Sequence, residues 1–374
     1  MKKVLFVATV VRLHINMFHK PFIRWFHEQG WQVDVAANND YDDPAECVIP
    51  CCDNHYVMPF ERSPLKKGNW EAYRQLKALL DREHYDIIHC HTPMGSVIAR
   101  LAAGSARNAG TKVLYTAHGF HFYDGAPLIN WLVYYPIERI LSRRTDVLFT
   151  MNQEDYRRAQ TFRAKRVELV NGVGMDITRF AEAPAEEKQS IRRELGLAEG
   201  DTFAISVAQL IPRKNHTTLI RATAKLQDPR FHLFIAGDGV QETELKTLAR
   251  ELGVQAQVHF LGFRRDVHRL CSAADLFLFA SFQEGLPVAV MEAMACGLPI
   301  VASAIRGNTD LIDPGRGGFL VDPEDAAGFA GAIRAILSDR ERLEQMKQYN
   351  LKKVRTYSIG AVTEQMAELY RSVM

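Results

Sequence analysis

Two glutamates stand eight positions apart in an otherwise apolar stretch, EGLPVAVMEAMACGLPIVAS, which spans residues 284–303. From Pro287 onward the stretch predicts a helix, because proline is tolerated at a first helical position and Gly297 follows near the end. On that helix Glu292 has only Val, Ala and Cys side chains one turn away, so no helical neighbour can pair with it. The pattern indicates either a carboxylate that binds a ligand or one that pairs with an arginine from another helix.

The start of this predicted helix is an expected anion site. Free N–H groups and the helix dipole at Pro287 favour a phosphate. Glu292 lies about 7–8 Å further along the axis, at 1.5 Å per residue, and Glu284 precedes the helix. Two acceptors flanking one anion site suit a nucleotide-sugar, in which hydroxyl groups lie on both sides of a pyrophosphate.

The elements that must position these residues form two series of short, β-branched strands separated by helical patterns. Such near-continuous apolar strands predict parallel sheets covered on both faces, hence two doubly wound α/β domains. The join is the Gly-, Pro- and charge-rich segment 171–189, with a hinge near residue 175. Strands are expected at 4–10, 32–38, 85–91, 112–118, 146–152 and 166–172, then at 203–209, 231–237, 258–263, 276–281 and 299–303, with helices including 16–29, 94–107, 128–142, 340–356 and 360–373.

Ligands of such folds bind beyond the carboxyl ends of the strands. This rule places the residues after the strand at 112–117, the GDG at 237–239, the GF at 262–263 and Glu284 on ligand-facing rims. We therefore expect the site in a cleft between the two domains.

Composition excludes several other classes. The chain has 374 residues, 47% of them hydrophobic and 24% charged, with a formal net charge of +2 and no basic-aromatic ladder. These values are typical of a globular protein and argue against a nucleic-acid binder. The six cysteines follow no disulfide or zinc spacing, which favours reduced thiols and a cytoplasmic location. No apolar run reaches about 18 residues, and the N-terminal run, broken by Arg12 and His14, favours a first buried strand over a signal peptide.

The sequence HCH at 89–91 raises the question of a metal site. Alternate residues of a strand share one face, yet no third ligand is obvious, so structural histidines are favoured and no metal is expected. Within HGFHF, His118 is the candidate for chemistry and His121 for packing.

The opening stretch resembles the E-x7-E motif of the family 4 retaining glycosyltransferases, which have the GT-B fold. VAQLIPRKNHTTLIRA resembles their phosphate-binding strand–loop–helix, FIAGDGVQETEL their Gly-rich loop and VHFLGF their base-binding loop. DIIHCHTP, YTAHGFHFY and NGVGMDITRF match further landmarks, so the resemblance spans essentially the whole chain. HGFHFYDGAPLINWLVYYPIERILSRRTD is most similar to the bacterial exopolysaccharide and capsule branch.

This resemblance implies a role for each matching residue. It implies that Lys214, with Arg213 beside it, contacts the donor diphosphate, that Glu284 binds the sugar hydroxyls and that Glu292 binds the ribose. It implies that His118 lies near the reacting sugar. The remaining donor-binding positions are the loop residues Gln209, Gly237 and Gly239, Phe263 and Arg264 beside the base, and the backbone of Gly285, Leu286, Pro287 and Val288.

The resemblance also implies the domain plan and the reaction. Residues 1–172 would bind the acceptor, 173–357 would bind the donor, and a final helix at 358–374 would pack back on the first domain. Transfer of a hexosyl or N-acetylhexosaminyl group would retain configuration, with the departing phosphate as base. The nucleotide-sugar is a substrate, so neither a cofactor nor a metal is expected.

Two departures from the family pattern concern the phosphates and the acceptor. Gln209 stands where the family often has an arginine, so Arg213 is the candidate replacement. The usual Gly-Gly of the first loop is replaced by VVRLHINMFHKP, which makes Arg12, His14 and His19 candidates on the acceptor side.

The expected acceptor is a lipid-linked saccharide at the inner face of the plasma membrane, and the expected donor is a UDP-sugar. Residues 1–170 carry 22 Lys and Arg against 18 Asp and Glu, whereas the remainder carries 24 against 26. This asymmetry and the aromatic-basic stretch 130–144 suit a peripheral anionic membrane contact, against the alternative of an ordinary solvated face. An inactive nucleotide-sugar-binding scaffold is the alternative function. A dehydrogenase is disfavoured because GDGVQE lacks a third glycine.

Overall fold

The computed structural model describes residues 1–374 and divides into two compact units. The first unit comprises residues 1–174 and 359–374, and the second comprises 175–358. The expected domain limits, 1–172 with 358–374 and 173–357, differ from these by one or two residues. None of the helices combines the length and the apolar character that a membrane span requires.

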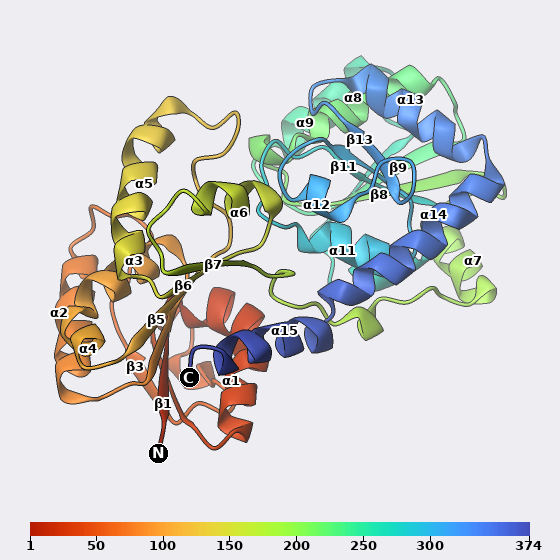
Figure 1. Cartoon of the computed structure of the whole chain (residues 1–374). Coiled ribbons are helices and arrows are strands. Elements are labelled where there is room, and N and C mark those ends of the chain that lie inside the picture. Colours follow the sequence, from red (N-terminus) through yellow and green to blue (C-terminus); the bar gives the residue numbers. More distant parts are fainter. The chain divides into compact units, whose positions relative to one another are not determined.

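The first unit is a seven-stranded parallel sheet with the order β3-β2-β1-β4-β5-β6-β7 (Figure 1). Its strand order reverses between β1 and β4, which pair in parallel from Val4↔Ile87 to Val7↔Cys90. The strands are β1 (Lys3–Val10), β2 (Gln32–Asn38), β3 (Asn54–Val57), β4 (Ile87–Cys90), β5 (Lys112–Ala117), β6 (Val147–Thr150) and β7 (Arg166–Leu169).

Helices cover both faces of this sheet, as near-continuous apolar strands require. A π-helix, η1 (Val11–His19), follows β1 directly and continues into α1 (Lys20–Glu28). The others are α2 (Gly68–Arg82), α3 (Pro93–Ala102), α4 (Gly104–Asn108), α5 (Leu128–Leu141), α6 (Gln153–Ala159) and the terminal α15 (Ile359–Arg371).

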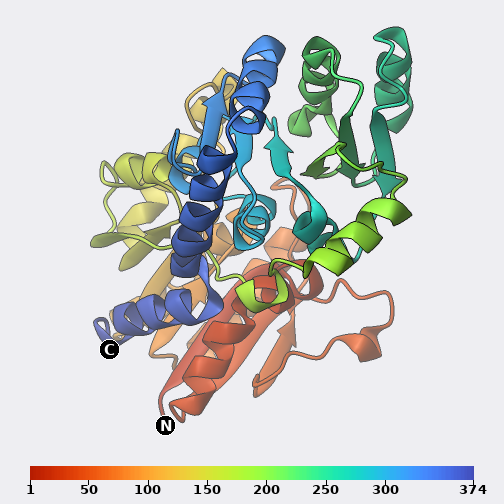
Figure 2. The ribbon, with the colours of Figure 1, turned by 90° about the vertical axis from the view of Figure 1, so that its right-hand side faces the viewer.

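The terminal helix α15 packs on α1 of the first unit (Figure 2). The ring of Tyr370 stacks on Trp25 at 5.5 Å between centroids, and its hydroxyl lies 2.9 Å from His89 Nδ1. His89 Nε2 lies 2.8 Å from Thr116 Oγ1, so both nitrogens of this buried imidazole have partners. These contacts join the C-terminal helix to the centre of the sheet.

The second unit is a six-stranded parallel sheet with the order β10-β9-β8-β11-β12-β13. The order reverses between β8 and β11. Its strands are β8 (Thr202–Val207), β9 (Phe231–Ala236), β10 (Val258–Gly262), β11 (Leu276–Phe279), β12 (Ile300–Ser303) and β13 (Gly318–Val321). Its helices are α7 (Ala185–Glu194), α8 (His216–Leu226), α9 (Glu242–Glu251), α10 (Val267–Ala273), α11 (Val288–Ala295), α12 (Asn308–Leu311), α13 (Ala326–Leu337) and α14 (Arg340–Lys353).

The predicted strands all form, and two further strands, β3 and β13, lie at sheet edges. NHYV of β3 is half polar and lacks the apolar run that identifies a buried strand. GFLV of β13 is apolar but begins with glycine, which is depleted in strands, and three of its four residues are only partly buried. The helix expected at 94–107 is divided into α3 and α4, and the one expected at 16–29 begins with α1 at Lys20.

Candidate functional site

The loop after β8 carries two cations and a residue that fixes the loop. Arg213 and Lys214 lie in a short 3-10 turn, and Asn215 adopts a left-handed conformation with φ of 53°. Asn215 Nδ2 donates to the carbonyls of Ala280 (3.1 Å) and Pro323 (2.7 Å). Asparagine tolerates this backbone conformation, so Asn215 both turns the chain into α8 and anchors the cations to the end of β11.

Both cations converge on Glu284, in the loop after β11. Glu284 Oε1 lies 2.6 Å from Lys214 Nζ, 3.2 Å from Arg213 Nη1 and 2.6 Å from Ser281 Oγ. Burial lowers the pKa of Lys214, and the Glu284 carboxylate opposes that shift. The arrangement is a preformed cation pair held by one acid, at the point where the strand order of the second sheet reverses.

The loop from Glu284 into α11 is held closely by its neighbours. The buried Arg306 donates from Nε to the Glu284 carbonyl at 2.9 Å. A side chain at Gly307, where φ is 83°, would come within 2.5 Å of the Gly285 carbonyl. Pro287 precedes the first residue of α11, and no side chain caps that helix end. Its first N–H groups are therefore available to an anion.

The GDG loop after β9 packs directly on the loop that follows β8. A Cβ atom at Gly237 would lie 2.0 Å from the Ala208 carbonyl oxygen, and one at Gly239 would lie 2.4 Å from that of Leu210. Any side chain here would displace the backbone around the exposed Gln209. These glycines therefore permit close approach of two backbones, which suits a loop that lies against phosphates.

The loop after β10 presents a ring to solvent. Phe263 is 69% exposed, an unusual state for a phenylalanine unless something covers it. Arg264 donates to both oxygens of Asp266, at 2.7 and 2.6 Å, which fixes its guanidinium beside the loop. The geometry suits an aromatic surface for a planar base.

Glu292 is largely buried on α11 and makes no hydrogen bond or ion pair through its carboxylate. Burial raises its pKa to about 7, and the positive charge of Arg179 only partly opposes this shift. Of the two alternatives from the sequence, pairing with an arginine of another helix is thus not realised as a direct contact. Arg179 lies in a short 3-10 turn, Ile177–Arg179, and influences Glu292 through its charge alone.

The buried carboxylate predicts a pH-dependent stability. A carboxyl whose pKa is raised on folding binds more protons in the native state, so stability falls as pH rises from about 4.5 through about 7. We expect Glu292→Gln to remove most of that decline, which amounts to about 3.5 kcal/mol at about 1.4 kcal/mol per pKa unit. Urea unfolding of both proteins between pH 4.5 and 8 measures the difference; parallel curves would contradict the prediction.

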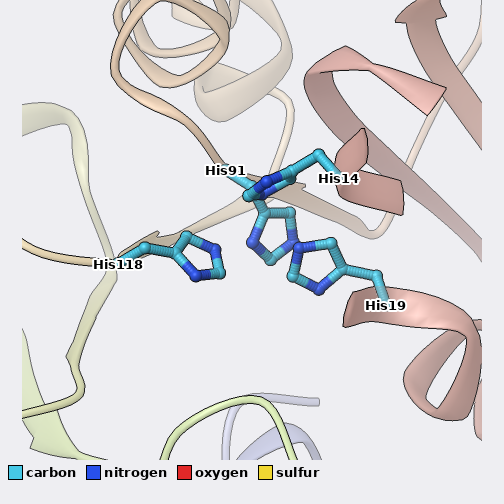
Figure 3. A group of neighbouring side chains, drawn as sticks. All are labelled: His14, His19, His91 and His118. Carbon is cyan, nitrogen blue, oxygen red and sulfur yellow. The ribbon is translucent and has the colours of Figure 1, made fainter. Parts of the chain in front are cut away.

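In the first unit, four histidines converge where β1, β4 and β5 end (Figure 3). His14 and His19 belong to the π-helix, whereas His91 and His118 directly follow β4 and β5. One ring nitrogen from each lies within 4.8 Å of the others. In a π-helix the backbone bonds join residues five apart, which accounts for His14 and His19 facing the same point.

The nitrogens of this cluster are largely without partners. His14 Nε2, His118 Nε2 and both ring nitrogens of His19 and His91 are buried and accept or donate no hydrogen bond. Burial lowers the pKa of each imidazole, to about 4 for His118. For His14, His19 and His91, the neighbouring histidines lower the pKa further. The four are therefore neutral imidazoles at neutral pH.

The structure groups the sequence candidates into two sets. Arg213, Lys214 and Glu284 form one cluster, and His14, His19 and His118 belong to the other. Arg12 does not join the histidines: its backbone N–H and side chain bond Asp40 and Asp42. His121 stacks on Tyr134 at 4.7 Å, in line with a packing role.

No third ligand for HCH was obvious from the sequence, but the structure brings further histidines to His91. Three histidines from other segments surround His91, and only His89 is held by structural partners. Asn215, Ser281 and Arg306 are further residues of the second-unit site that were not predicted from the sequence. Asn215 had a signal, since it belongs to the motif RKN. Ser281 and Arg306 had none, because their bonds to the 284 region depend on how the loops meet.

Two family models match the chain, one in each unit. "Glycosyl transferase 4-like" matches residues 3–152, and "Glycosyl transferases group 1" matches residues 187–353. Together they span most of both sheets.

Curated relatives match over similar lengths. The chain is 42% identical to EpsD of Bacillus subtilis (strain 168), named as a candidate glycosyltransferase, over all of this chain and 97% of that one. It is 29% identical, over 79% of this chain and 77% of the other, to the Escherichia coli UDP-Gal:alpha-D-GlcNAc-diphosphoundecaprenol alpha-1,3-galactosyltransferase. Among solved structures, Anabaena HepE in complex with UDP and glucose has a TM-score of 0.79 at 22% identity, with both chains covered completely.

Proposed function

The chain is a glycosyltransferase of family 4 with the GT-B fold, and we propose that it moves a sugar from a UDP-sugar to a lipid-linked saccharide, with retention of configuration, in cell-surface polysaccharide synthesis. The observation that carries the proposal is the convergence of Arg213 and Lys214 on Glu284 beside the uncapped start of α11. These groups gather positive potential next to a sugar-binding carboxylate.

The leaving nucleoside diphosphate needs stabilisation of negative charge that grows on its oxygens. In our proposal Lys214, Arg213 and the first N–H groups of α11 supply it by preorganised electrostatics. On donor binding the diphosphate replaces part of the Glu284 contact with the cations, and Glu284 turns to the sugar hydroxyls. The bond from the anomeric carbon to the diphosphate oxygen breaks as the acceptor hydroxyl attacks the same face, and the departing phosphate takes the hydroxyl proton.

The ribose and base occupy the far side of the diphosphate in this proposal. The Glu292 carboxylate, which no side chain bonds, accepts from ribose hydroxyls, and its ionised form is the competent one. Phe263 and Arg264 border the base, while the close-packed Gly237 and Gly239 leave room for phosphates. UDP is favoured because the E. coli relative is named for UDP-Gal and HepE is described with UDP.

Calorimetric titration with UDP tests the donor half of the proposal. We expect binding in EDTA to equal binding with magnesium, because the cations of the second unit replace a metal. Glu292→Ala should weaken UDP binding by roughly 10²-fold or more, since two hydrogen bonds to a charged acceptor are lost, each worth about 1.5–3 kcal/mol. Glu242→Ala, which removes a partly exposed carboxylate of α9 that pairs with Lys246, is the matched control. UDP binding that vanishes in EDTA and returns with magnesium would refute the proposal.

An inactive nucleotide-sugar-binding scaffold is the alternative. Such a scaffold would bind UDP, as the enzyme does, but would not transfer the sugar. The tight three-donor contact on Glu284 favours an enzyme, since a scaffold needs no preformed cation pair beside a sugar carboxylate. Release of UDP from a UDP-sugar in the presence of a diphosphoundecaprenol-linked sugar distinguishes the two.

The acceptor side of the proposal rests on the surface of α5. Seen along the helix, Leu128, Ile129, Leu132, Val133, Ile137 and Ile140 form one exposed apolar stripe, between 39% and 72% exposed. The one acidic residue of the helix, Glu138, points inward and pairs with the buried Arg100 at 2.8 Å. A helix with its apolar side outward and its acid inward is the reverse of an ordinary surface helix.

Positive charge accompanies this stripe. Arg139 lies on the last turns of α5, and Arg143 and Arg144 follow it, all three exposed. An apolar stripe next to basic side chains suits the boundary of an anionic bilayer, where the lipid-linked acceptor resides. We therefore propose peripheral attachment through α5, which brings the first unit to its acceptor.

A further inference from the structure

The mechanism proposed above assigns no chemical step to the histidine cluster of the first unit, beyond the place near the reacting sugar that the family resemblance implies for His118. Its four rings come from three separate segments, η1, the end of β4 and the end of β5, and Figure 3 shows them turned toward a common centre. It lies where the strand order reverses, the usual ligand position of a doubly wound sheet.

Packing alone accounts poorly for this cluster. His19 and His91 are each only 1% exposed and stack at 3.7 Å between centroids, yet none of their four ring nitrogens has a hydrogen-bond partner. An unsatisfied buried polar group costs about 1–3 kcal/mol. By contrast, His89 beside them satisfies both nitrogens, which is how a structural histidine behaves.

We propose that His14, His19, His91 and His118 bind one divalent transition-metal ion of the zinc class. Four atoms within 4.8 Å of one another fit inside a sphere of roughly 2.9 Å radius, and small side-chain rotations bring them to the 2.0–2.1 Å of zinc–imidazole bonds. Neutral imidazole is a preferred ligand of zinc, copper and nickel, whereas magnesium and calcium select oxygen. The four histidines supply no oxygen ligand, so the site does not suit magnesium or calcium.

The site carries a further consequence for its ligands. Four neutral imidazoles leave the dication uncompensated, and the charge of Arg62 also reaches His14. His14 and His118 are partly exposed residues, whereas His19 and His91 are buried. An anionic oxygen, such as that of a phosphate, is therefore the ligand class that would approach the ion from the side of His14 and His118. The metal site is independent of the proposed donor site, which lies in the other unit.

The experiment uses full-length protein without a histidine tag, stripped of metal by a chelator and titrated with zinc chloride alone. We expect one equivalent to bind and to raise the melting temperature by mass action. His118→Gln and His14→Gln should each weaken binding at least about tenfold, because even changes in the surrounding shell cost 10–100-fold. His121→Gln, which alters a stacked histidine of the same loop, is the matched control and should bind as the wild type does.

Cobalt provides a readout that needs no variant. Four nitrogen ligands in tetrahedral geometry give bound Co²⁺ an intense visible absorption that the hydrated ion lacks, and zinc should displace it. Substoichiometric zinc binding, or equal zinc affinity in His118→Gln, His14→Gln and His121→Gln, would overturn the proposal. UDP binding measured on the same stripped protein keeps this result separate from the proposed function, since it should persist without metal.

Discussion

Lys214→Ala is expected to lower turnover by about 10²–10³-fold, the range seen when one preorganised charge-stabilising group is removed. Lys214 is the cation held most closely at the site, 2.6 Å from Glu284, and its burial strengthens its interaction with charge. Negative charge on the leaving oxygens grows in the transition state, so the loss should fall on kcat more than on KM. Steady-state UDP release measures both.

The contact with Glu284 makes a second variant necessary. Removing Lys214 alone leaves a carboxylate facing the donor diphosphate with fewer counter-charges, and repulsion would add to the loss. In Lys214→Ala/Glu284→Gln that repulsion is absent. If the double variant is still about 10²-fold slower than Glu284→Gln, the missing cation is the cause. Lys246→Ala, which alters an exposed lysine on α9, is the matched control.

Arg213 and Gln209 complete this test. Arg213 Nη1 is 3.2 Å from Glu284 but also donates to the Gln283 carbonyl at 2.6 Å, and its side chain is 40% exposed. Arg213→Ala should therefore cost less than Lys214→Ala. A gain of turnover when Gln209→Arg is added to Arg213→Ala would show that the two positions serve one phosphate. Full turnover in Lys214→Ala would refute the mechanism.

The parallel sheets of both units could be predicted because their central strands have a clear sequence signal. LFVA in β1 and LFLF in β11 are continuous apolar runs, and such runs have no stable place except between two layers of helices. An edge strand does not need such a continuous apolar run. β3 has a neighbouring strand on one side only, and its sequence NHYV is partly exposed.

The second-unit cluster was predictable for a related reason. Lys214 and Glu284 follow adjacent strands, β8 and β11, and the carboxyl ends of parallel neighbours always share one edge. The contacts of Arg306 and Ser281 with the 284 region were not predictable, because they depend on side-chain directions in loops without a repeating pattern.

The histidine cluster shows a different limit. Spacing rules for helices pair residues three or four apart, so they give no reason to expect that His14 and His19, five apart, face one point. The π-helix after β1 changes that relation, and no pattern in VRLHINMFH predicts so rare a conformation. His91 and His118 then add the remaining rings from β4 and β5, neighbours in the sheet but far apart in sequence.

Membrane attachment is expected to fail when the apolar stripe of α5 is made acidic. Ile129 and Leu132 are 61% and 65% exposed, one turn apart on the stripe. Burying each of these side chains in the lipid boundary contributes about 1.5–3 kcal/mol to the free energy of membrane binding. Ile129→Glu/Leu132→Glu should therefore weaken binding to phosphatidylglycerol–phosphatidylethanolamine vesicles by at least about 10²-fold, as measured by flotation.

The basic residues should act through a separate, salt-sensitive contribution. Neutralising Arg139 and Arg143 to glutamine removes about 1 kcal/mol per charge at an anionic surface, hence a loss of roughly tenfold or more that disappears on neutral vesicles.

Glu substitutions at Val48 and Leu65, exposed at 65% and 93% elsewhere in the first unit, are the matched control for the charge added in Ile129→Glu/Leu132→Glu. Wild-type protein that stays with the soluble fraction, or an α5 variant that floats as well as the Val48→Glu/Leu65→Glu control, would show that this stripe does not hold the enzyme at its acceptor. Retained UDP release with a water-soluble acceptor analogue would locate the defect of the α5 variant in membrane contact, because α5 supplies no group to the donor site of the second unit.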